Sequence, residues 1–151
     1  MVDIRMIAEI ISAFFVVFFF NVLLELPKRY VFITAAAGAI GWGMYLVVYK
    51  FVQSPMMAAF GSTLVVSLLG YILARVEKAP VTVFLVSGTL PAVPGAAIYR
   101  SVYYFIHNDP ELCSHYMAET VQVAGAIAMG IFIMDSLFRL YLQYEKKHST
   151  S

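Results

Sequence analysis

A long apolar stretch in the second half of the sequence is interrupted at residues 88–95, Gly-Thr-Leu-Pro-Ala-Val-Pro-Gly. Pro91 and Pro94 remove two backbone N–H donors and clash with the preceding helical turn, while Gly95 adds backbone freedom. Inside a membrane, freed backbone groups are tolerated only where protein or water satisfies them, and transporters place substrates at such broken helices. The pattern predicts a binding site for a small solute at Pro91, Pro94 and Gly95. The alternative is a plain proline kink that helps the helices pack.

A single arginine follows this break by five residues. Arg100 lies in the otherwise apolar run 96–106, where a charge costs at least about 2.5 kcal/mol unless it is paired or hydrated. A guanidinium can hold a carboxylate through two parallel hydrogen bonds, so Arg100 is a candidate ligand for an organic acid or an amino acid. In the alternative, the side chain snorkels to the membrane interface about 10 Å away.

Three acidic residues in apolar segments are candidates for proton coupling. Glu9 and Glu119 lie near the same predicted membrane face as Arg100, so either could be its counter-ion. Asp135 lies roughly 27 Å along its segment, where an intramembrane carboxyl is a candidate proton carrier. The alternative for Asp135 is a local ion pair with Arg139, four residues further along the same helix face.

The other polar and small residues favour packing roles. Asn21 is expected to make an inter-helix hydrogen bond. Small residues recur every four positions, which lets helices approach closely within the chain or against a partner helix; they are Ala35, Ala39 and Gly43, and then Ala126 and Gly130. The loop 107–115 alternates possible metal ligands, but Pro110 and the lack of a second ligand cluster argue against zinc. We expect no metal, no cofactor and no enzymatic activity, since the histidines lie in loop and tail and no nucleophile–base pair is apparent.

The composition of the chain predicts that its apolar segments lie in a lipid bilayer. Hydrophobic residues make up 62% of the 151 and charged residues 13%, against about half and a quarter in a soluble domain. At roughly 20 residues per span, the chain holds about five. The prediction is one domain over 1–151, an all-α polytopic transmembrane helix bundle whose fourth span is broken; the spans are about 4–26, 30–49, 55–73, 81–107 and 117–144. No basic run points to nucleic acid.

Charges outside the spans predict the orientation. One side would carry six basic residues, namely Lys28, Arg29, Arg75, Lys78, Lys146 and Lys147. The other side would carry Arg5 and Lys50. This bias places the N-terminus outside and the C-terminus in the cytoplasm. A four-span chain with a re-entrant fourth segment would conflict with it. Because Arg5 is the only basic residue ahead of the first apolar run and no small-x-small site follows, we expect a retained span rather than a signal peptide.

Residues 88–99, from Gly88 to Tyr99, resemble the signature of the threonine/serine exporter family: a Pro-x-x-Pro-Gly segment followed shortly by an aromatic residue. Size and expected topology resemble the small subunit of its split members and the C-terminal membrane half of its fused members. Two positions depart from the pattern. Ala92 stands where a bulkier apolar residue is common, and Arg100 is not assigned to the family pattern, so its role rests on physical reasoning alone.

The resemblance implies a subunit that exports small amino acids or organic acids across the cell membrane. Threonine and serine are the implied substrates, with succinate as a further one, and Tyr99 joins the expected substrate-binding residues. It also implies a larger membrane subunit of the same family as partner, and a homo-oligomer is possible besides. Proton coupling is expected. The alternative function is a non-transporting scaffold or regulatory subunit, for which Pro91, Pro94 and Arg100 would tolerate substitution.

Overall fold

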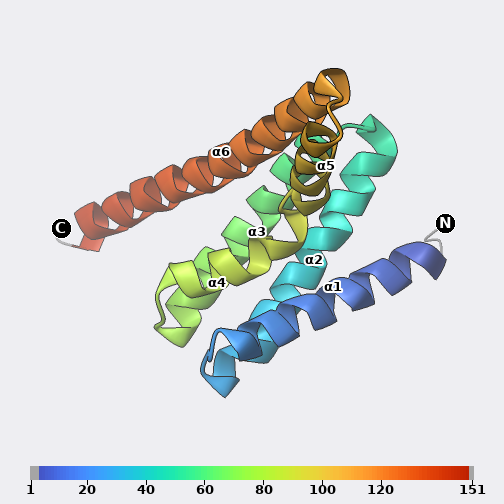
Figure 1. Cartoon of the computed structure of the whole chain (residues 1–151). Coiled ribbons are helices and arrows are strands. Elements are labelled where there is room, and N and C mark those ends of the chain that lie inside the picture. The colour runs from blue at the N-terminus through green and yellow to red at the C-terminus, as the bar shows by residue number, and fades with distance from the viewer. Residues whose placement is uncertain (1–3, 150–151) are drawn as a thin grey trace.

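The computed structural model describes residues 4–149, and side chains through residue 144; every regular element within that range is helical (Figure 1). The elements follow one another as α1 (Ile4–Leu23), α2 (Lys28–Val52), α3 (Pro55–Glu77), α4 (Val81–Thr89), the short 3₁₀ helix η1 (Leu90–Ala92), α5 (Gly95–Ile106) and α6 (Pro110–Ser149). Helices α2 and α3 pack against each other at the centre, with α1 against α2 and α6 against α3.

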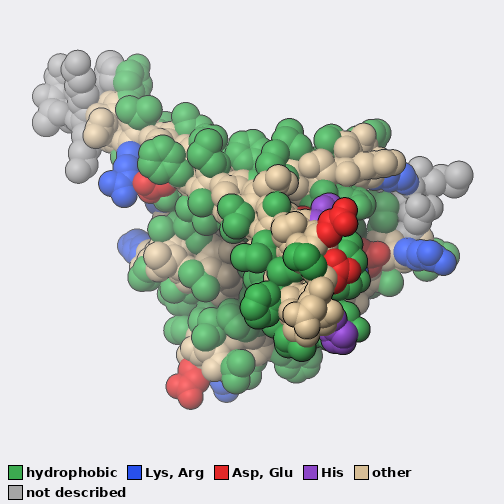
Figure 2. Space-filling model, turned by 45° about the horizontal axis from the view of Figure 1, so that its top comes forward, with side chains coloured by type: hydrophobic (Ala, Val, Ile, Leu, Met, Phe, Trp, Pro, Cys, Tyr) green, Lys and Arg blue, Asp and Glu red, His purple; other side chains and the backbone are tan. Residues whose placement is uncertain are grey.

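Four helices, α1, α2, α3 and α6, are long and apolar enough to cross a membrane. A fifth span is formed if α4 with η1 and α5 cross as a pair, and these two halves meet at a bend of 55°. Large apolar side chains cover the outside of the bundle, as Figure 2 shows for one face. The predicted all-α polytopic bundle with a broken fourth segment is confirmed.

Helix α6 begins earlier than the predicted fifth span, at Pro110 rather than near residue 117. Proline suits the first helical position, where its missing N–H costs nothing. The Asp109 side chain caps the helix, because its Oδ1 accepts a hydrogen bond from the Leu112 N–H at 3.1 Å. The predicted loop 107–115 is therefore mostly the first turns of α6.

Packing residues inferred from the sequence lie between helices of this chain. Asn21 is fully buried, and its Nδ2 donates to Thr34 Oγ1 at 2.6 Å, which joins α1 to α2 as expected. Ala35 and Ala39 are buried on α2. On α6, a Cβ at Gly130 would lie 3.1 Å from the Thr63 side chain of α3. These small residues serve close approach between helices of this chain.

Helices α2, α3 and α4 meet around Val66. A Cβ built on Gly41 would lie 2.2 Å from Val66 Cγ2, and one built on Gly88 would lie 2.6 Å from Val66 Cγ1. The Val66 side chain thus occupies a space that only two glycines leave open. This contact fixes the half-helix α4 against the central pair, and the break that follows α4 is positioned by it.

We expect Gly41→Ala to destabilise the fold by about 1–3 kcal/mol, because the new methyl group overlaps Val66 in a packed core. The measurement is the thermal unfolding midpoint of the purified protein in detergent. Gly125→Ala is the matched control: it lies on α6 with no atom within 4 Å of its Cβ position. Equal midpoints for the two variants would contradict the tight packing at Val66.

Candidate functional site

The break between α4 and α5 is an irregular stretch of backbone inside an apolar segment. Helix α4 ends at Thr89, η1 carries Pro91, and Val93 is extended before α5 begins at Gly95. The Gly95 N–H donates to the Val93 carbonyl at 2.8 Å, which turns the chain tightly. Ala96 and Ala97 lie in the first turn of α5, whose N–H groups have no acceptor within the helix.

A cavity of about 170 Å³ lies against this break. Residues 91–97 form one wall, and the remaining wall residues come from α2, α3 and α6: Trp42, Tyr45, Pro55, Glu119 and Val123. The structure therefore brings together Pro91, Pro94 and Gly95 with Glu119, a residue predicted separately as a proton-coupling candidate. We call this space the break cavity.

The lining of the break cavity includes two polar features of opposite character. Its one charged wall residue is Glu119, which is partly buried. The first turn of α5 supplies backbone N–H groups, which favour negative charge as helix N-termini do. The aromatic rings of Trp42 and Tyr45, stacked with centroids 4.6 Å apart, add faces that attract cations. Such a site can hold both a carboxylate and an ammonium group.

Glu9, an exposed residue of α1, lines a second, open cavity that shares Trp42 and Pro91 with the first. This space, of about 390 Å³, is lined by one face of α1 and by Trp42, Leu90 and Pro91; the α1 residues are Glu9, Ser12, Ala13 and Val16. The Ser12 hydroxyl donates to the Ala8 carbonyl at 2.8 Å. Glu9 is the one charged residue in the lining of this cavity. We call it the α1 cavity.

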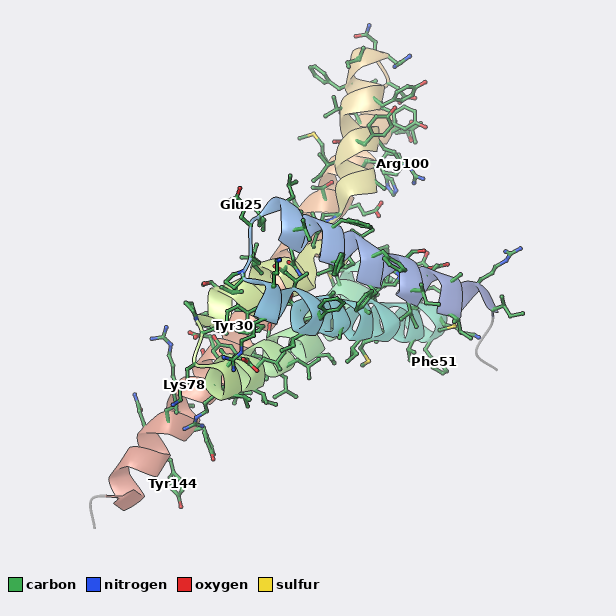
Figure 3. All side chains as sticks on the ribbon, turned by 90° about the horizontal axis from the view of Figure 1, so that it is seen from below. Glu25, Tyr30, Phe51, Lys78, Arg100 and Tyr144 are labelled. Carbon is green, nitrogen blue, oxygen red and sulfur yellow. The ribbon has the colours of Figure 1, made fainter. Side chains whose placement is uncertain are left out.

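Tyr99 and Arg100 lie outside both cavities, on the exposed surface of α5. Figure 3 shows Arg100 on the part of the molecule where α5 extends away from α1 and α2. The guanidinium carbon lies 5.4 Å from the ring centroid of Tyr116, and among the described residues Arg100 forms no ion pair with Glu9 or Glu119. Tyr99 is 69% exposed and stacks on Tyr103. In this structure neither residue contacts the break cavity.

Asp135 has partners for both of its carboxylate oxygens. The Tyr71 hydroxyl donates to Oδ1 at 2.5 Å and Arg139 Nε donates to Oδ2 at 2.7 Å. Tyr71 also stacks on Phe138, with ring centroids 4.6 Å apart. The expected local pair with Arg139 is present, and Tyr71 extends it into a contact between α3 and α6.

One comparison with known proteins decides the class of this molecule. The family model described as Threonine/Serine exporter, ThrE matches residues 9–137, from α1 to most of α6. The chain belongs to the threonine/serine exporter family. No curated protein and no solved structure matches the sequence. Membership, with the apolar helices, makes this a multi-pass membrane protein of an exporter family.

The match to this exporter family includes the whole break cavity, although sequence reasoning had missed the wall that α2 supplies. Trp42 and Tyr45 come from α2, three residues apart, and Tyr49 continues the same stacked row. Aromatic residues at helical spacing were the available signal. Nothing in the spacing showed that this face turns toward the break rather than toward lipid.

The segment 107–115 was the one stretch whose residue types suggested a metal site. No group of three His, Cys, Asp or Glu side chains is placed to hold a metal ion in the part of the chain that the structure describes. The segment 107–115, which alternates such residues, is taken up largely by helix α6, and Cys113 is buried there.

Proposed function

We propose that this chain is the small subunit of an exporter that binds threonine or serine in the break cavity. The observation that carries the proposal is that Glu119 and the first turn of α5 line the same cavity. An α-amino acid carries an ammonium and a carboxylate on neighbouring atoms. The carboxylate would accept hydrogen bonds from the α5 N–H groups, and the ammonium would face Glu119 and the rings of α2.

The size of the cavity supports a small substrate. At about 170 Å³, it lies below the roughly 300–1,000 Å³ of pockets that take drug-sized ligands. A three- or four-carbon amino acid suits such a space. Succinate fits the polarity less well, because its second carboxylate would face Glu119.

For proton coupling, Glu119 is the proposed carrier and Glu9 the second candidate. Both carboxylates lie in cavities next to the break. Asp135 is held by Tyr71 and Arg139, which suits a contact between helices better than a role in proton exchange. Arg100 stays a candidate carboxylate ligand only for a state in which α5 rotates or a partner covers it.

The arrangement of the helix ends supports the proposed orientation in the cell membrane. In Figure 3, Glu25, Tyr30 and Lys78 lie at one end of the bundle and Phe51 at the other. The first end holds the α1–α2 and α3–α4 connections with Lys28, Arg29 and Lys78. Positive charge favours the cytoplasm, so that end and the C-terminus are proposed to face inward.

A larger subunit of the same family is the proposed partner. Large apolar side chains are exposed along α1, α5 and α6; lipid, the partner or a second copy of the chain could cover them. Five spans are few for a carrier that places its site between two repeats.

The test measures efflux from cells that express the chain alone, the presumed partner alone, or both. Cells are loaded with labelled threonine, serine or succinate. We expect the pair to export threonine and serine, and to discriminate against succinate by at least about tenfold, because a buried charge mismatch costs more than 1.4 kcal/mol. Efflux with the pair no faster than with the partner alone would contradict the exporter role and favour a scaffold. Efflux by the chain alone would contradict the split assembly.

A further inference from the structure

Two cavities of this molecule share a wall. The break cavity and the α1 cavity are both lined by Trp42 and Pro91. Beyond this wall they differ: α1 closes one, and α3, α5 and α6 close the other. Trp42 and Pro91 therefore separate two neighbouring spaces, with volumes of about 390 and 170 Å³.

Each space holds one carboxylate. Glu9 belongs to the α1 cavity and Glu119 to the break cavity. A carboxylate in an apolar segment is costly unless it meets water, a cation or a proton. An ammonium group moving from one space to the other would leave one acid and meet the next, with the aromatic face of Trp42 between them.

The side chain between the two spaces has support on one side. Trp42 is partly buried and stacks on Tyr45 at an interplanar angle of 5°. Across the α1 cavity, α1 is packed mainly against α2, through close contacts such as Val17 against Gly38. Only Ala13, Val17 and Asn21 of α1 are buried. The wall thus consists of the Trp42 ring and of η1, and the part of α1 beyond it that carries Glu9 precedes the first buried residue of that helix, Ala13.

We infer that Trp42, with Pro91, is a gate between the break cavity and a second binding space at Glu9, which receives the ammonium group of the transported amino acid. This inference rests on the proposed function and adds to it a second subsite and the residue that controls passage. When this gate is closed, the Trp42 indole keeps the break cavity small, so that only small substrates fit. Constrictions formed by large apolar side chains gate other membrane pathways in the same way.

The test compares Trp42→Ala with Trp42→Phe in the exporter pair, using efflux of labelled threonine and of labelled phenylalanine. Removing the ring should raise the phenylalanine-to-threonine efflux ratio at least about fivefold, whereas phenylalanine at this position should raise it less than about twofold, since pocket shape sets such discrimination. Phe51→Ala is the matched control, because Phe51 is an aromatic residue of the same helix that is 83% exposed and lines neither cavity. Thermal unfolding of each purified variant checks that it is folded.

An unchanged ratio in folded Trp42→Ala would overturn the gate. Loss of threonine efflux in both folded Trp42 variants would also overturn it, because a gate of this kind predicts that the smaller ring of Trp42→Phe keeps threonine efflux.

A binding measurement separates failure of the gate from failure of the proposed function. Trp42 is the only tryptophan of the 151 residues, so in this chain indole fluorescence reports on it alone. Titrating the purified chain with threonine should change the Trp42 emission. Glu9→Gln should raise the half-saturating threonine concentration by at least about threefold, because the carboxylate that binds the ammonium group is lost. An unchanged half-saturating concentration in Glu9→Gln, in a pair that exports threonine, would sink the gate to a second binding space and leave the exporter standing. Absence of threonine efflux from the unaltered pair would sink both.

Discussion

Glu119→Gln is expected to slow threonine efflux by the exporter pair by about 10- to 100-fold. Glutamine keeps the size of the side chain but loses the negative charge in the lining of the break cavity. A hydrogen bond to a charged group contributes about 1.5–3 kcal/mol, and an unpaired ammonium in the cavity would forfeit it. The measurement is the initial rate of labelled threonine efflux, with membrane levels of the chain checked in parallel.

Glu111→Gln is the matched control for this substitution. It removes the same charge from the same helix, in the exposed first turn of α6, and Glu111 lines neither the break cavity nor the α1 cavity. We expect its efflux to stay within about twofold of the unaltered pair, as for a surface charge. Equal rates for the two variants would remove Glu119 from the site.

Exchange assays divide the two roles proposed for Glu119. If the carboxylate binds the substrate amine, Glu119→Gln should lose both net efflux and threonine–threonine exchange. If it carries only the proton, exchange should continue while efflux against a threonine gradient stops. Retained exchange would therefore contradict the binding role and leave the coupling role in place.

The spans and the break follow from local chemistry, which is why they were predictable. Long apolar runs need a bilayer, and Pro91 and Pro94 cannot continue a regular helix. The pairs Asn21–Thr34 and Asp135–Arg139 show how far such local reasoning reaches. The second joins residues four apart on one helix, and its geometry is given by helical spacing. The first required an expectation about another helix, and the sequence predicted the kind of bond but not the partner.

The walls of the break cavity depend on tertiary structure. Helical spacing relates residues on one side of a break, but Val93 is extended and Pro94 precedes a new helix, so the phase of α5 is not continued from α4. This is why Tyr99 and Arg100, placed near the site by distance along the chain, lie on the outside of α5. Trp42 and Tyr45 face the break only because α2 packs against α3 and α4 at Val66.

Substitution of Gly95 is the most direct test of whether threonine occupies the break cavity. A Cβ built on Gly95 meets no atom within 4 Å, although the residue lines the break cavity. A side chain there should enter open space without displacing the packed helices. We expect threonine efflux to fall only a few-fold in Gly95→Ala and by at least about tenfold in Gly95→Leu, because a mismatch of 1.4 kcal/mol or more in substrate binding corresponds to that loss.

The graded series is informative because stability should not follow activity. An added Cβ meets no atom at Gly95, and we expect the unfolding midpoints of both variants to stay close to that of the unaltered chain. Gly125→Leu, in open space on α6 and away from the break cavity, adds the same bulk and should leave efflux intact. Full efflux by folded Gly95→Leu would show that threonine does not pass through the break cavity. Loss in Gly95→Leu alone, with Gly125→Leu active, would indicate that the substrate and the leucine side chain compete for the same space.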